Sequence, residues 1–167
     1  LGIDQTIKIY LFSIDWQTMS IPLIEPVFYI EPSHNTLGSY LWVLLGLENV
    51  AIVPHIIFVI VLSFVLFEYW RFYSTVRGVS FWSKGFVHLF LVGALANVID
   101  NIFHGGSLDY ITIRPFYIFD LKDMFITMAE IFALIEVIDQ KLYKNTKDLK
   151  GFSAFVKEDV KGWFAKK

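Results

Sequence analysis

The chain has 167 residues, of which 56% are hydrophobic and 17 are Phe, with a mean hydropathy of +0.56 and a net charge of −2. This apolar share is above that of an average soluble domain, and the length allows one domain. The chain has no Cys, which excludes disulfides, zinc thiolates and a thiol nucleophile, and its four His have no metal-binding spacing. It also has no Walker loop and no basic groove interleaved with aromatic residues, so we expect no metal, no other cofactor and no nucleic-acid partner.

Four apolar stretches are candidates for membrane-spanning helices, because a span takes roughly 20 mostly apolar residues. They are residues 1–14, 50–69, 85–103 and 117–138. The first stretch is short and begins without Met, so we expect that the numbering starts inside a first helix. The predicted fold is an all-α membrane protein with four transmembrane helices in one domain, residues 1–143.

The positions of Lys and Arg predict the orientation of these helices. No Lys or Arg lies between Lys8 and Arg71, whereas the connector from Arg71 to Lys84 holds three and the connector at residues 105–116 holds only Arg114. Because basic residues favour cytoplasmic loops, both termini and the middle connector are predicted to be cytoplasmic. The first and third connectors then face outward.

The first outer connector, residues 15–38, contains two short stretches rich in β-branched and aromatic residues, 21–24 and 27–30. They predict short strands that form a small extracytoplasmic β-cradle. Residues 39–49 are too few to span and predict a short interfacial helix, with Trp42 at headgroup depth.

The C-terminal residues, 144–167, carry apolar side chains at helical spacing and seven Lys against three acids, a net charge of +4. This pattern predicts a basic amphipathic cytoplasmic tail that rests on anionic lipid. A frayed, charged tail is the alternative.

Asp109 lies in the loop after the third span, and Asp123 lies just inside the fourth, 14 positions later. A carboxylate near hydrocarbon is costly, and a turn could bring these two face to face. Two close carboxylates cannot both ionise easily, so they would share one proton and could perform acid–base hydrolysis. Asp120, three residues before Asp123, shares its helix face, whereas Lys122 faces another direction.

A second polar group lies at the end of the third span, where Asn97, Asp100 and His104 are predicted to point at one spot. It is either part of a functional site or a hydrogen-bonded cluster that holds helices together. Gly105 and Gly106 then end the helix.

Four segments together resemble the lipoprotein signal peptidase (signal peptidase II) family. GALANVIDNIFHGGSLDYI, residues 93–111, resembles its block G-A-x-x-N-x-x-D-R-x-x-x-G-x-V-x-D-F-[IV]. FDLKDMFI, residues 119–126, resembles its segment F-N-x-A-D-[SAC]-x-I. Asp4, Gln5 and Lys8 resemble its D-Q-x-x-K signature, and residues 21–41 resemble the connector that carries an Asn, here Asn35.

The resemblance implies a bacterial plasma-membrane aspartic endopeptidase that cuts near the outer face. The sequence does not indicate an oligomeric state, and we take a monomer as the default. Its substrate would be a diacylglyceryl-prolipoprotein, held with membrane lipid and cut just before the lipidated Cys. Asp109 and Asp123 would be catalytic. The residues that would orient the pair and the substrate are Asn35, Asn97, Asp100 and Asp120. The residues that would support the site are Asp4, Lys8 and Gly105.

The chain also departs from the family pattern and is a divergent member on this reading. Asn101 replaces Arg, Asp120 replaces Asn, Lys122 replaces Ala and Met124 stands where Ser is common. Lys122 either changes the ionisation of the neighbouring acids or extends outward to water. The alternative function is therefore an impaired paralogue that binds lipoproteins or signal peptides without cutting them. A third hypothesis is a small proton-coupled transporter that uses the same acids and Glu130.

Overall fold

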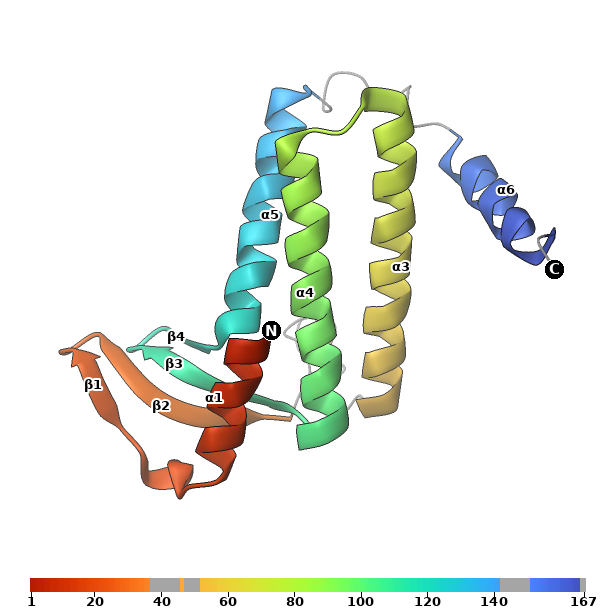
Figure 1. The fold of residues 1–167 in the computed structure, drawn as a ribbon. Coiled ribbons are helices and arrows are strands. Elements are labelled where there is room, and N and C mark those ends of the chain that lie inside the picture. The colour runs from red at the N-terminus through yellow and green to blue at the C-terminus, as the bar shows by residue number, and fades with distance from the viewer. Residues whose placement is uncertain (37–45, 47–51, 142–150, 166–167) are drawn as a thin grey trace.

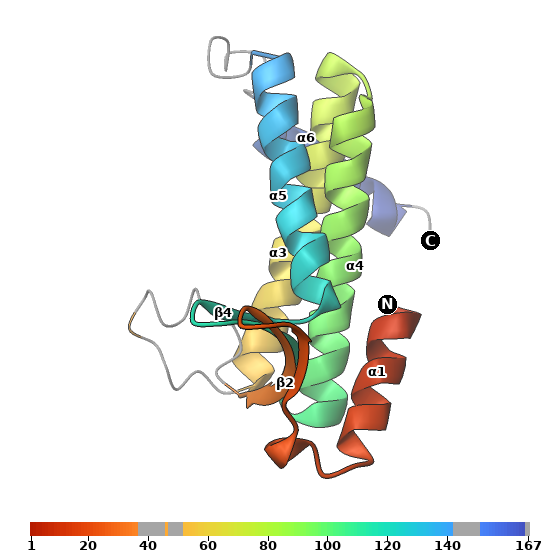
Figure 2. The same ribbon diagram turned by 90° about the vertical axis from the view of Figure 1, so that its left-hand side faces the viewer.

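A computed structural model describes residues 1–36, 46, 52–141 and 151–165. Three long helices, α3 (Ile52–Arg77), α4 (Phe81–His104) and α5 (Leu121–Asp139), run side by side (Figures 1 and 2). A shorter helix, α1 (Gly2–Phe12), lies beside the C-terminal part of α4, and a single 3-10 turn, η1 (Trp16–Thr18), follows it. The sheet lies at the end of the bundle where α4 finishes and α5 begins (Figure 1).

Two helices, α3 and α4, are long and apolar enough to cross a membrane. Helix α5 carries five charged residues, and α1 has 11 residues. The described residues therefore include two helices that are long and apolar enough to cross a membrane. Four transmembrane helices remain a prediction.

Capping residues set the ends of α4 and α5. Ser80 Oγ accepts the Ser83 N–H at 2.9 Å at the start of α4, and Gly105 ends that helix with a φ of 67°. At α5, an Asp120 carboxylate oxygen accepts the Asp123 N–H at 3.2 Å. The predicted start of the fourth span at residue 117 was wrong, because Asp120 caps the helix and residues 117–119 form a strand.

The sheet has four antiparallel strands in the order β1 (Ile21–Ile24), β2 (Phe28–Asn35), β3 (Ser107–Ile113) and β4 (Tyr117–Phe119). The two strands predicted in the first connector are present, and the second continues to Asn35. In the β2–β3 pairing Asn35 lies opposite Ser107 and Ser33 lies opposite Asp109. The interfacial helix predicted at residues 39–49 lies outside the described residues apart from Gly46.

The far end of the bundle is held by Glu136 of α5. Its carboxylate accepts hydrogen bonds from Tyr73 Oη and Ser80 Oγ, both at 2.5 Å. Glu136 therefore joins α5 to the end of α3 and to the start of α4.

A helix is present in the predicted tail, α6 (Phe152–Ala165), and it packs against α3. Asp159 accepts two hydrogen bonds from Arg71, at 2.6 and 3.0 Å, and this contact lowers the pKa of Asp159. The Phe152 ring lies edge-on to Tyr69, with 5.4 Å between ring centroids. Contact of the tail with lipid remains a prediction.

Close approach of α4 and α5 depends on Gly93. A Cβ at this position would lie 2.6 Å from Ile126 Cγ1 and 3.3 Å from the Lys122 backbone oxygen. The missing side chain therefore allows the first turns of α5, which carry Lys122 and Asp123, to lie directly on α4.

We expect Gly93→Val to push α5 away from α4 and to lower the free energy of unfolding by about 1–3 kcal/mol, the usual cost of overpacking. Thermal unfolding in detergent measures this effect. Gly2→Val is the control, because a Cβ at Gly2 has no neighbour within 4 Å. Equal stability of both variants would contradict the close packing described here.

Candidate active site

Asp109 on β3 and Asp123 in the first turn of α5 approach each other at the sheet end of the bundle. Carboxylate oxygens of Asp109, Asp120 and Asp123 all lie within 4.8 Å of one another. The Asp109 side chain is 11% exposed and that of Asp123 is 27% exposed. Asp109 and Asp123 are therefore close together, as their 14-residue spacing predicted, and Asp123 is the more exposed of the two.

Asp120 links the other groups of the site. It is fully buried, and while one of its oxygens caps α5, Oδ2 lies 2.5 Å from Lys8 Nζ and 2.6 Å from Lys122 Nζ. Asp120 therefore binds two ammonium groups that come from α1 and from α5.

Lys122 extends into the site toward the neighbouring acids and does not extend outward to water, the other position that the sequence allowed. Its side chain is buried, and Nζ lies 2.5 Å from Ser107 Oγ and 3.3 Å from Asp109 Oδ1. Asp123 Oδ1 is 3.6 Å away. The prediction that Lys122 faces another direction was wrong, because a long side chain at the start of a helix can reach groups that precede the helix.

Lys8 attaches α1 to the same site. Its Nζ is buried and lies 3.0 Å from Asp4 and 2.5 Å from both Asp100 and Asp120. Tyr110 Oη donates to Asp4 Oδ1 at 3.1 Å, and burial and this carboxylate raise the pKa of Tyr110. The Tyr110 hydroxyl therefore stays protonated and remains a donor.

Asn35 reaches the acid pair, whereas Asn97 does not. Asn35 Nδ2 lies 3.5 Å from Asp109 Oδ2, at the limit of a hydrogen bond. Asn97 Oδ1 lies 2.9 Å from His55 Nε2 on α3 and 3.2 Å from Asn101 Nδ2. Asn97 therefore contacts the neighbouring helix rather than the carboxylates.

The predicted convergence of Asn97, Asp100 and His104 was wrong for Asn97, whereas Asp100 and His104 both face α1. Asp100 contacts Lys8, and His104 stacks on Phe12 with 4.8 Å between ring centroids. Three positions along a helix leave about 60° between side chains, enough for Asn97 to meet α3 while Asp100 meets α1.

Two groups of three carboxylates in the described part of the chain are close enough to hold a cation. They are Asp4, Asp100 and Asp120, and Asp109, Asp120 and Asp123. Lys8 Nζ lies within 4.0 Å of all three members of the first group, and Lys122 Nζ does the same in the second. In each group a lysine ammonium supplies positive charge where a metal ion would otherwise lie.

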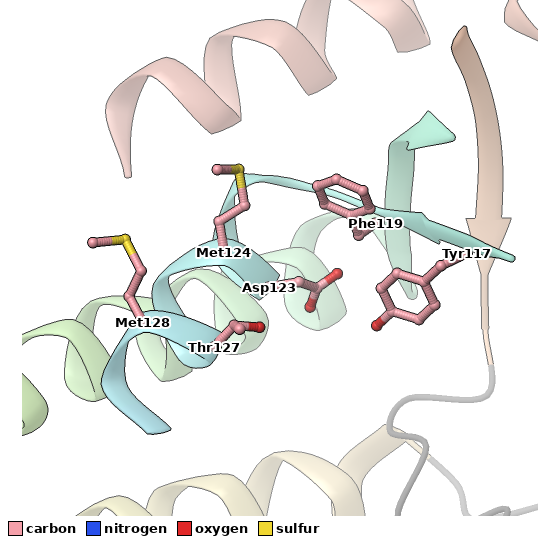
Figure 3. A pocket seen from close by; sticks show the side chains of 6 residues that line it. All are labelled: Tyr117, Phe119, Asp123, Met124, Thr127 and Met128. Atoms are coloured by element: carbon pink, nitrogen blue, oxygen red, sulfur yellow. The ribbon is translucent and has the colours of Figure 1, made fainter. Parts of the chain in front are cut away.

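A pocket of about 330 Å³ opens beside Asp123. Figure 3 shows the Asp123 carboxylate turned toward the Tyr117 ring, with Met124 and Met128 farther along α5. Phe119 and Thr127 complete the lining. Most of the wall is apolar, so the pocket suits a hydrocarbon group held next to a carboxylate.

We expect Lys8→Met to lower the free energy of unfolding by about 3–5 kcal/mol, because removal of one partner leaves buried carboxylates without their cation. Thermal unfolding in detergent tests this, with Lys84→Met as the control, since Lys84 is exposed near the start of α4. A Lys8→Met protein as stable as the control would show that the buried ion pairs contribute little.

The chain was compared with known proteins. The family model described as signal peptidase (SPase) II matches residues 1–139. The lipoprotein signal peptidases of Halothermothrix orenii and Clostridioides difficile are 30% and 28% identical to the chain. Each match covers 83% of this chain, and the matches cover 90% and 88% of the two relatives. The lipoprotein signal peptidase of Allorhizobium ampelinum is 31% identical over 81% of both chains.

Two solved structures described as bacterial membrane enzymes share the fold. One has a TM-score of 0.66 at 22% identity and covers 87% of this chain and 86% of its own. The other has a TM-score of 0.62 at 21% identity, with 81% and 84% covered. The match of the family model over residues 1–139 and the relative at 30% identity show that the chain belongs to the signal peptidase II family of bacterial membrane proteases.

Proposed function

We propose that this enzyme removes the signal peptide of diacylglyceryl-modified prolipoproteins by cutting just before the lipidated Cys. Water would be activated between Asp109 and Asp123. The observation that supports this proposal is the approach of the two carboxylates to within 4.8 Å, beside an apolar pocket. Membership of the family supports cleavage of lipoprotein signal peptides in general.

The proposed chemistry is general acid–base catalysis by one shared proton. The ionised carboxylate takes a proton from water as the water oxygen bonds to the scissile carbonyl carbon. The protonated carboxyl gives its proton to the carbonyl oxygen. When the C–N bond breaks, the carboxyl that took the proton from water gives it to the leaving amine. The other carboxylate takes a proton back from a hydroxyl of the diol.

The orienting residues would act at different distances from the pair. Asn35 lies within reach of Asp109, and Asp120 fixes the first turn of α5 and therefore Asp123. Asp100 would act through Lys8, together with Asp4, and Asn97 would act through α3. Gly105 lets the chain leave α4 and enter β3.

The proposed membrane arrangement is supported by α3, α4 and the positions of the basic residues. With both termini and the α3–α4 connector in the cytoplasm, the sheet and the acid pair would lie near the outer face of the bacterial plasma membrane. Helices α1 and α5 would complete four membrane helices within residues 1–143, and residues 144–167 would form the cytoplasmic tail. The pocket beside Asp123 would then take part of a lipid chain of a substrate bound to a monomer.

We expect Asp109→Asn and Asp123→Asn each to lower cleavage of a fluorescent diacylated lipobox peptide by about 10²–10⁴-fold, because each removes one partner in proton transfer. The assay uses purified protein in detergent. Asp139→Asn, exposed at the other end of α5, is the matched control. Full activity in either site variant would refute the acid-pair mechanism.

One observation favours a second function, a binding protein that does not cut. Lys122 Nζ lies 3.3 Å from Asp109 Oδ1 and 3.6 Å from Asp123 Oδ1, and a cation that keeps both acids ionised would remove the general acid. On this reading the unmodified protein binds the diacylated peptide without cleaving it, and Lys122→Ala gains cleavage. Binding and cleavage of the same peptide are measured for both proteins. Cleavage by the unmodified protein would exclude this function.

A further inference from the structure

We propose that Lys122 and Ser107 are positioning residues that give the two acids different roles. They hold Asp109 ionised as the base and leave the shared proton on Asp123 as the acid. This inference rests on the proposed function above and adds to it which aspartate performs which step.

Asp109 is surrounded by hydrogen-bond donors. Its Oδ1 lies 2.8 Å from Ser107 Oγ and 3.3 Å from Lys122 Nζ, and its Oδ2 lies 3.5 Å from Asn35 Nδ2. A carboxylate that accepts bonds from several donors, one of them charged, is stabilised in its ionised form. Asp109 therefore suits removal of a proton from water.

Asp123 has a different environment. Its Oδ2 accepts the Asp120 backbone N–H at 3.3 Å, while Lys122 Nζ lies 3.6 Å from Oδ1, beyond the usual length of a hydrogen bond. Asp123 also lines the pocket and is the more exposed of the two acids. It is therefore the acid that a substrate carbonyl reaches, and the shared proton belongs there.

Lys122 acts through Asp109 rather than on the substrate. An ammonium has three hydrogens, and the Nζ of Lys122 has three acceptors in Ser107 Oγ, Asp120 Oδ2 and Asp109 Oδ1. With these contacts made, no hydrogen remains for a substrate oxygen. The function of the ammonium is then to fix the charge on Asp109.

Three departures from the family pattern meet in this network. Ser107, Asp120 and Lys122 stand where the pattern has Val, Asn and Ala, and they contact one another. Lys122 Nζ lies 2.5 Å from Ser107 Oγ and 2.6 Å from Asp120 Oδ2, and Ser107 Oγ lies 3.1 Å from Asp120 Oδ2. Because a buried Lys without partners is strongly disfavoured, the three residues form one arrangement in which each supports the others.

The charged and titratable groups around the two buried ammonium groups come from several elements. They are Asp4 and Lys8 of α1, Asp100 of α4, Asp109 and Tyr110 of β3, Tyr117 of β4, and Asp120, Lys122 and Asp123 at the start of α5. Strand β2 adds the uncharged Asn35. Five carboxylates thus face two ammonium groups, which leaves the cluster with enough negative charge to retain a proton on Asp123.

The test is the pH dependence of kcat/KM for the diacylated peptide. The unmodified protein gives a bell-shaped pH profile, whose two limbs report the acid pair as a unit. In Lys122→Met both limbs move to higher pH by about 1–3 units, because a nearby cation that favours the ionised forms is gone. Lys84→Met is the control and leaves the bell in place.

Ser107→Ala keeps the ammonium and removes the nearest donor to Asp109, so it moves the acid limb upward by less than Lys122→Met does. This variant also serves as the test if Lys122→Met fails to fold. A lower rate with both limbs unmoved in these variants would show a structural role only and would overturn this inference while the proposed function stands. Failure of the unmodified protein to cleave at any pH would overturn both.

Discussion

The structure depends on one buried contact, the binding of Lys8 and Lys122 to the same Asp120 oxygen. Charges that leave water are tolerated only when they are paired and hydrogen-bonded. Here α1, α4, β3 and the start of α5 all contribute partners, so the network joins segments that are up to 112 positions apart. Removal of any one partner leaves the others buried and unbalanced, which ties the integrity of the site to the fold.

Regular backbone geometry, rather than a flexible loop, brings Asp109 and Asp123 together. Gly105 turns the chain directly from α4 into β3, which is held by its pairing with β2, and Asp120 fixes where α5 begins. Gly93 then allows the first turns of α5 to lie on α4. Side chains on helices and strands keep their geometry better than side chains on loops, which suits the proposed sharing of one proton between Asp109 and Asp123.

The sequence predicted the long helices well, because apolar runs of about 20 residues have few other interpretations. It also predicted the approach of Asp109 and Asp123. It did not separate β4 from α5, since Tyr117–Phe119 is apolar and continuous with the helix, and only the cap at Asp120 divides them. Helical periodicity likewise could not predict the contacts of Asn97. It shows which residues of α4 share a face, but which neighbouring helix packs on that face depends on the tertiary structure.

The position of Lys122 was the least predictable feature and has the largest consequence. A helical-wheel argument separates it from Asp123, yet its long side chain reaches groups on β3 that precede the helix. Where the family pattern has Arg at position 101, this chain has Asn101, which bonds Asn97 instead. The segments that carry the family motifs hold two buried ammonium groups, Lys8 of α1 and Lys122 of α5, and Lys122 Nζ lies 3.3 Å from Asp109 Oδ1 and 3.6 Å from Asp123 Oδ1. Because interactions between charges strengthen in a buried site, an ammonium at this position acts strongly on the neighbouring carboxylates.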